Sequence, residues 1–169
     1  SIIYLILSHS KKFFFLPLFF FIMVVSEEFF QEKLSLAQLS PSNVKSVHAF
    51  CEKNMHFWSQ PFIYFKRATL GDSKFDPDLT LVATVKDTNK IVGFFMGTTR
   101  KSVFISIRTK NYLKFFLVDR SMRRMGMATW LLEILYQKFK SKGRKGRIFA
   151  LTTPPDYWFS GVNPKFTPA

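Results

Sequence analysis

The chain has 169 residues, of which 47% are apolar and 18% aromatic; this suffices for one domain with a hydrophobic core and excludes an intrinsically disordered chain. Its net charge is +14, and residues 101–169 hold 14 lysines and arginines against three acidic residues, which is +11 of that total. A basic half of this kind favours an anionic ligand, whether nucleic acid, a lipid surface or a phosphate-bearing cofactor, and charge does not choose among them.

Cys51 is the only cysteine in the sequence, which excludes an intrachain disulfide and a cysteine zinc cluster. The three histidines, His9, His48 and His56, are too scattered to resemble a metal site, so we predict that no metal is bound. A lone cysteine is typical of a reducing compartment, and we predict a cytoplasmic location.

Residues 1–25 form an apolar segment with only two charges, Lys11 and Lys12. Its longest apolar run, Phe13 to Val25, is 13 residues long and contains Pro17, whereas a helix needs ~20 residues to span a bilayer. Three interpretations stay open: translated upstream sequence before the first methionine, Met23, a membrane anchor, or a signal-like peptide. Any membrane association would depend on this segment alone.

The segment from residue 31 to residue 58 predicts a short strand followed by a helix. Val44, Val47, Cys51 and Met55 recur on one helical face, and Ser40 or Ser42 would cap the helix. Residues 61–78 have mixed character, with loop signals at Gly71-Asp72 and Asp76-Pro77.

The central part of the chain predicts β-structure. Leu79–Val85 and Ile91–Thr98 are β-type runs joined by the turn 87–90, which predicts a hairpin, and Val103–Ile107 would extend it. Tyr112–Val118 is almost continuously apolar, which indicates a central strand.

A second helix is predicted from Gly126 to Lys142, followed by a strand in "GRIFALTT" and a loop to the end. The apolar face of this helix consists of Met127, Leu131, Ile134, Leu135 and Phe139. Strand, helix, hairpin, strand, helix and strand in this order predict one mixed α/β domain.

The turn that precedes this helix has the sequence "RRMGMAT", residues 123–129, and is called the basic turn below. Gly126 and Ala128 let a ligand approach the backbone, and the first amides of a helix have no acceptor inside the helix. Those amides and the helix dipole bind phosphate groups readily, and Arg123 and Arg124 add cationic donors beside them. The basic turn therefore predicts a pyrophosphate site.

Arg123-Arg124-Met125-Gly126-Met127-Ala128 also resembles the Arg/Gln-x-x-Gly-x-Gly/Ala signature of the GNAT (GCN5-related) N-acetyltransferases. "DYWFSGVNPKFTPA" resembles a second stretch that follows the next strand in some members. The resemblance covers residues 31–169, which we expect to form the N-acetyltransferase domain. It implies the GNAT-type acyl-CoA acyltransferase fold, a central mixed, mostly antiparallel sheet with flanking helices. It also implies that the last strands are missing and that the chain is a fragment.

The resemblance implies direct transfer of an acetyl group from acetyl-CoA, as co-substrate, to a primary amine. The pantetheine arm would pair with the strand before the basic turn, and the pyrophosphate would lie on the turn itself. The implied cofactor-binding residues are Phe116, Leu117, Val118, Arg123, Arg124, Met125, Gly126, Met127, Ala128 and Thr129.

The catalytic residues stay open, because the tyrosine that serves many members as general acid belongs to a helix beyond Ala169. Tyr157 is a substitute, although an aromatic packing residue fits its position better. Glu52 and His56 could face an amine, but a solvated glutamate and a packed or surface histidine are the simpler interpretations. Asp119 reads as a structural cap, and Cys51 as a core residue.

Two other functions are compatible with the sequence. A CoA-binding domain without activity would keep the basic turn and lack the acid. A nucleic-acid-binding module would use the stretch "KFKSKGRKGR", residues 138–147, although a solvated helix end explains it better. The acceptor amine and the oligomeric state cannot be inferred.

Overall fold

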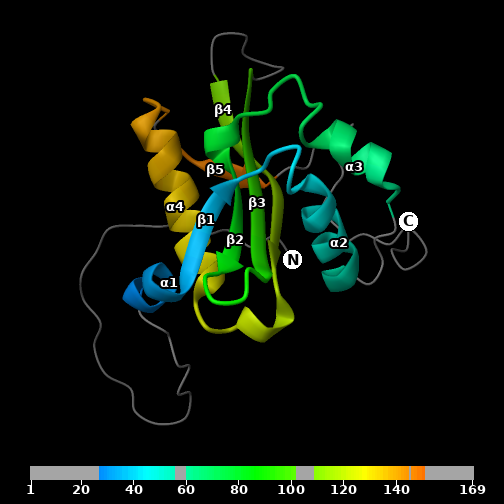
Figure 1. The fold of residues 1–169 in the computed structure, drawn as a ribbon. Helices are drawn as coiled ribbons and strands as arrows, with labels where there is room; N and C mark the ends of the chain where they lie inside the picture. Colours follow the sequence, from blue (N-terminus) through cyan, green and yellow to red (C-terminus); the bar gives the residue numbers. More distant parts are fainter. Residues whose placement is uncertain (1–26, 56–59, 102–108, 145, 151–169) are drawn as a thin grey trace, which may run out of the picture.

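The computed structural model describes residues 27–55, 60–101, 109–144 and 146–150. Its elements form one five-stranded sheet in the order β1-β2-β3-β4-β5, in which only β4 and β5 are parallel (Figure 1). In chain order they are α1 (Glu27–Lys33), β1 (Leu34–Gln38), α2 (Val44–Asn54), α3 (Phe62–Ala68), η1 (Pro77–Leu79), β2 (Thr80–Val85), β3 (Ile91–Lys101), β4 (Thr109–Val118), η2 (Arg120–Met122), α4 (Met127–Ser141) and β5 (Ile148–Ala150).

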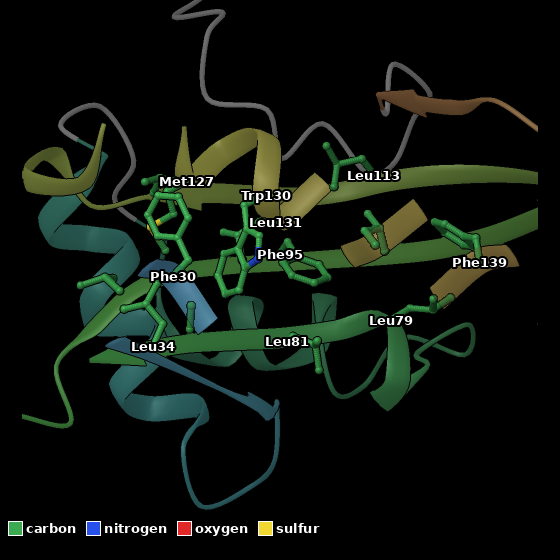
Figure 2. Close-up of a cluster of buried hydrophobic side chains, with 14 residues drawn as sticks. Phe30, Leu34, Leu79, Leu81, Phe95, Leu113, Met127, Trp130, Leu131 and Phe139 are labelled. Carbon is green, nitrogen blue, oxygen red and sulfur yellow. The ribbon is translucent and has the colours of Figure 1, made fainter. Parts of the chain in front are cut away.

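The helices cover both faces of the sheet, α1 and α4 on one side and α2 and α3 on the other (Figure 1). Each face has its own apolar core. On the α4 face, Phe30 of α1 stacks on Trp130 of α4 with ring centroids 5.3 Å apart (Figure 2). On the α2 face, Phe65 packs edge-on against Phe94 and Phe115. The layered α/β architecture predicted from the sequence is confirmed.

Helix α4 packs closely on β3 because that strand carries glycine at two contact points. A Cβ atom at Gly93 would lie 2.8 Å from the terminal methyl of Met127, and one at Gly97 would lie 2.7 Å from a Leu135 methyl. A side chain at either position would force the Met127 or Leu135 side chain to move. The two glycines thereby allow α4 to pack close to the sheet, including at its first residue.

The predicted hairpin is confirmed, since β2 and β3 pair antiparallel from Thr80↔Met96 to Thr84↔Ile91. The helix predicted over Gly126–Lys142 is also confirmed, within a residue at each end. The segment Val103–Ile107 lies outside the described residues.

Three local features differ from the sequence prediction. Helices α1 and α3 were not predicted, because each is only seven residues long and too short to show helical periodicity. The capping prediction was wrong: Asn43 is the N-cap of α2 and makes no side-chain capping bond, while the hydroxyls of Ser40 and Ser42 bond to each other at 2.7 Å.

Strand β4 contains a bulge at Lys114. Met96 pairs with Phe115 and Gly97 with Leu113, so Lys114 is an extra residue opposite β3. Its side chain is buried and forms an ion pair with Asp72, from the loop after α3. Arg100 of β3 lies 3.6 Å from the same carboxylate. This buried pair fastens the loop after α3 to the middle of β4.

We expect Gly97→Val to destabilise the protein by about 1–3 kcal/mol, because its side chain overlaps Leu135 and Phe139. Urea denaturation measures the change. Ala37→Val is the control: it places the same side chain at an exposed position of edge strand β1. Equal stability of the two variants would show that the close packing of α4 does not depend on Gly97.

We expect Lys114→Met to lower the free energy of unfolding by about 3 kcal/mol at pH 7, because it removes the nearest cation from the buried Asp72 carboxylate and leaves Arg100 3.6 Å away. Burial raises the pKa of Asp72, but the hydrogen bonds from Lys114 and the Lys74 amide outweigh it and bring the pKa below its usual value. The pair therefore stabilises the fold above the unfolded-state pKa, ~3.9, and this contribution is lost as the pH falls through the folded-state value.

Urea titrations at pH 7 and at acidic pH check this expectation: the deficit of Lys114→Met should shrink as Asp72 becomes protonated. Lys140→Met removes an exposed lysine of α4 and should stay within about 0.5 kcal/mol of the native chain. A deficit independent of pH would mean that packing of the lysine stem, and not its charge, matters at this site.

Candidate functional site

The basic turn joins the end of β4 to α4 through two residues in the left-handed region. Arg124 has φ 63° and Gly126 has φ 92°, whereas Arg123 is extended. Glycine adopts such a φ without the steric cost that a Cβ atom brings, which explains its place directly before the helix. The chain reverses here and starts α4 beside the end of β4.

The amino terminus of α4 has no side-chain cap. The Trp130 amide donates to the Gly126 carbonyl at 3.1 Å, which is the first bond of the helix. The amides of Met127, Ala128 and Thr129 therefore have no acceptor within α4. Ala128 and Thr129 are exposed, and the first turn contains no acidic residue. The helix thus presents free donors and its positive dipole end to solvent, which fits a phosphate group.

Asp119 fixes the start of the turn. Its amide donates to the Val92 carbonyl at 2.8 Å, and its carboxylate accepts from the Ser121 amide at 2.9 Å and the Ser121 hydroxyl at 2.6 Å. Burial raises the pKa of this carboxyl, but the hydrogen bonds from Ser121 and the positive charge of Lys90 outweigh that effect. The pKa therefore lies below its usual value. The structural cap predicted for Asp119 is confirmed.

The two arginines of the turn differ in their surroundings. Arg123 Nε donates to the Val118 carbonyl at 3.1 Å, which ties the basic turn to the last residue of β4. Both side chains are exposed. Arg123 is therefore held beside the strand end, next to the free amides of α4, where an anion would meet it.

The free edge of β4 lies next to the turn. Because the Asp119 amide bonds to β3, the alternation of an antiparallel ladder directs the main chain of Leu117 to β3 and that of Phe116 and Val118 to the opposite edge. Among the described residues, β5 pairs only with Asn111–Leu113 and leaves this edge uncovered. Phe116 thus offers its backbone groups and Val118 its amide, since the Val118 carbonyl accepts from Arg123, whereas the backbone groups of Leu117 are committed to the sheet.

The predicted cofactor-binding residues of the basic turn differ in how far they are buried. Met127 is fully buried in the core of the α4 face, so its side chain is not available to a ligand. Met125 and Gly126 are half-buried. The predicted interaction with a cofactor therefore depends on backbone amides and on two arginines. Tyr157 and His56 lie outside the described residues.

The remaining candidates on α2 have structural partners. Cys51 is completely buried, and burial, with a smaller contribution from Glu52, raises the pKa of its thiol, which makes it a core residue. Glu52 lies 3.6 Å from Nδ1 of His48, whose Nε2 is 2.7 Å from the Gln60 carbonyl. His48 also packs against Phe62 and Phe65 and so joins α2 to α3.

No helix in the described part of the chain has the length and apolar character needed to cross a membrane. No group of three or more potential metal ligands comes together within the same residues.

Comparisons with known proteins agree with this geometry. The model of the acetyltransferase (GNAT) family matches residues 47–157, which include β4, the basic turn and α4. A comparison with curated proteins gave no match.

Several solved structures share the fold. A GCN5-related N-acetyltransferase from Sphaerobacter thermophilus has a TM-score of 0.54 and 21% identity over 68% of this chain and 34% of that one. The glucosamine N-acetyltransferase region of a fungal multi-domain GH3 β-N-acetylglucosaminidase has a TM-score of 0.59 and 19% identity over 73% and 14%. Saccharomyces cerevisiae N-myristoyltransferase with bound myristoyl-CoA has a TM-score of 0.57 and 14% identity over 66% and 27%.

The chain thus spans about a third or less of the length of these three proteins, and at such identities the likeness concerns the fold. The family match covers well over half of the chain and includes the element that carries the predicted signature. The chain belongs to the GNAT acetyltransferase family.

Proposed function

We propose that this protein is an N-acetyltransferase that transfers the acetyl group of acetyl-CoA directly to a primary amine. The observation that carries the proposal is the uncapped amino terminus of α4, where three backbone amides without helical acceptors follow the left-handed Gly126. Membership of the acetyltransferase family supports the same chemistry.

The donor would be bound by two adjacent backbone surfaces. The amides of Met127, Ala128 and Thr129, with Arg123 and Arg124 beside them, would hold the pyrophosphate. The uncovered edge of β4 at Phe116 and Val118 would pair with the amides of the pantetheine arm, with Leu117 supplying apolar contact. These groups fit a ligand with an anionic middle and an amide-bearing arm, which is the chemistry of CoA.

In the reaction, the neutral amine nitrogen forms a bond to the thioester carbonyl carbon, the carbon–sulfur bond breaks, and the thiolate takes up a proton. Asp119 is a poor general base, because its carboxylate accepts two hydrogen bonds from Ser121 and its pKa is lowered. The proton donor stays open: Tyr157 is a candidate, although an aromatic packing role fits its position better. The amine acceptor stays open.

The acceptor cannot be recruited by the acidic residues after α3. Asp72 is paired with Lys114, and Asp76 and Asp78 are both paired with Lys142, at 3.0 and 2.9 Å. These carboxylates are neutralised within the protein, so their charge is not available to attract a cationic amine. We further propose that residues 31–169 form the N-acetyltransferase domain and that it acts in the cytoplasm, where acyl-CoA is available.

We expect Gly126→Asp to weaken acetyl-CoA binding by at least about tenfold, or ~1.4 kcal/mol, because the added carboxylate repels the pyrophosphate. Isothermal titration calorimetry of the full chain measures the affinity. Gly143→Asp is the matched control: Gly143 is also left-handed, with φ 71°, but follows the other end of α4. Equal affinities of the two variants would contradict a pyrophosphate site at the basic turn.

We expect the native chain to release CoA thiol from acetyl-CoA faster when primary amines are added. A thiol-reactive dye follows the release with spermidine, a lysine peptide and a peptide with a free amino terminus, and Gly126→Asp serves as the inactive control. Tight acetyl-CoA binding with no amine-dependent release would indicate a CoA-binding protein without turnover. Salt-sensitive nucleic-acid binding without CoA binding would replace the proposal with the alternative module.

A further inference from the structure

An open hollow lies at the end of the sheet away from the basic turn. This open cavity of about 830 Å³, the distal cavity below, is bordered by the ends of β3 and β4, the loop after α3 and Arg144, three residues after α4. In Figure 1 this carboxyl end of α4, in orange, is at the top of the view and the helix start is at the bottom. The lining residues include Asp72, Lys74, Asp76, Thr99, Arg100 and Arg144.

The two carboxylates in this lining have cationic partners. Asp72 is paired with the buried Lys114 and lies 3.6 Å from Arg100. Asp76 lies 3.0 Å from Lys142, which also pairs with Asp78. Burial raises the pKa of Asp72, but the hydrogen bonds from Lys114 and the Lys74 amide outweigh it and bring the pKa below its usual value, so this carboxylate stays ionised and paired at neutral pH.

The cations in the lining are in excess. Among the described residues, neither Lys74 nor Arg144 has a carboxylate within ion-pair distance. Arg144 is nevertheless held in place: its Nη1 donates to the Thr99 hydroxyl at 2.6 Å, and its carbonyl accepts from Asn111 Nδ2 at 3.2 Å. A half-buried guanidinium that is fixed by neutral groups retains its charge for an anion.

We infer that the distal cavity binds a small metabolite through a phosphate or carboxylate group, with Arg144 as its main ionic partner and Lys74 at the rim. Its volume is within the range of about 300–1,000 Å³ that holds small molecules, and well above the size of an inorganic ion. Thr99 and Thr109 add hydroxyl groups for the polar part of such a ligand. This site is additional to the proposed acetyl-CoA site and does not depend on it.

The basic turn is a competing anion site, and the length of β4 separates it from the distal cavity. Thr109, the first residue of β4, borders the distal cavity, whereas the turn follows Val118 at its other end. Ten residues of extended strand span roughly 30 Å, so a single phosphate cannot contact both. Variants at each end can therefore assign a bound anion to one site.

Calorimetric titration of the full chain with inorganic phosphate, glycerol 3-phosphate and glycerol tests the inference. We expect both phosphates to bind saturably and glycerol not to bind. Arg144→Gln should weaken phosphate binding at least about fivefold, Lys74→Gln by less, and Arg144→Lys should retain most of it, since the charge is kept. Lys140→Gln removes an exposed cation outside the lining and should change the affinity less than about twofold.

Gly126→Asp separates the two sites. Phosphate binding that survives Gly126→Asp and is lost in Arg144→Gln supports the distal cavity, whatever the outcome for acetyl-CoA. Binding lost in Gly126→Asp and kept in Arg144→Gln would place the anion on the basic turn and overturn the inference. Absence of saturable binding, or equal weakening by Lys140→Gln and Arg144→Gln, would also overturn it. Circular dichroism of each variant confirms folding, and Lys74→Gln replaces Arg144→Gln as the decisive variant if the latter unfolds.

Discussion

The close approach of α4 to β3 is the constraint on which the rest of the structure depends. Gly93 lies under Met127, the first helical residue, and Gly97 lies under Leu135, two turns further on. Because the helix is held at both points, its first amides are fixed relative to the end of β4. The left-handed Gly126 and the Asp119–Val92 bond complete the connection. The start of α4 and the open edge of β4 are thereby positioned relative to each other, and the side chains that position them are mostly buried.

The two ends of α4 carry different chemistry. Its amino end is uncapped and has free amides, two exposed arginines and no acidic residue. At its carboxyl end, Lys142 is matched by Asp76 and Asp78, and Arg144 is fixed by Thr99. The high net charge is therefore not one uniform basic surface. Part of it is paired within the protein, and part of the remainder lies at the basic turn and around the distal cavity.

The sequence allowed the central elements to be predicted because they are long and periodic. The hairpin β2–β3, strand β4 and helix α4 each show a clear apolar pattern, and the signature in the basic turn identified the candidate donor site. Helices α1 and α3 were missed because seven residues show no periodicity. The bulge and the Asp72–Lys114 pair were also missed, because pairing register and a contact over 42 positions are set by tertiary structure. The single lysine within the apolar run "YLKFFLV" was the sequence feature that could have indicated a buried ion pair.

It could not be predicted either which residues of β4 direct their main-chain groups to β3 and which direct them to the open edge. The resemblance implied backbone contacts from Phe116, Leu117 and Val118 alike, but which of them faces the open edge depends on register with β3. The Asp119–Val92 bond settles that register and leaves Phe116 and Val118 on the open edge. Apolar sequence patterns assign side chains to faces and do not assign main-chain groups to neighbours.

The most direct test of the central claim, that the free amides of α4 hold the CoA pyrophosphate, is amide NMR of the ¹⁵N-labelled chain during titration with CoA. The account predicts that the largest shift changes fall on Gly126, Met127, Ala128 and Thr129, with smaller ones on Phe116 and Val118. Largest changes at the carboxyl end of α4 and around Arg144, with the Gly126–Thr129 amides unmoved, would contradict it.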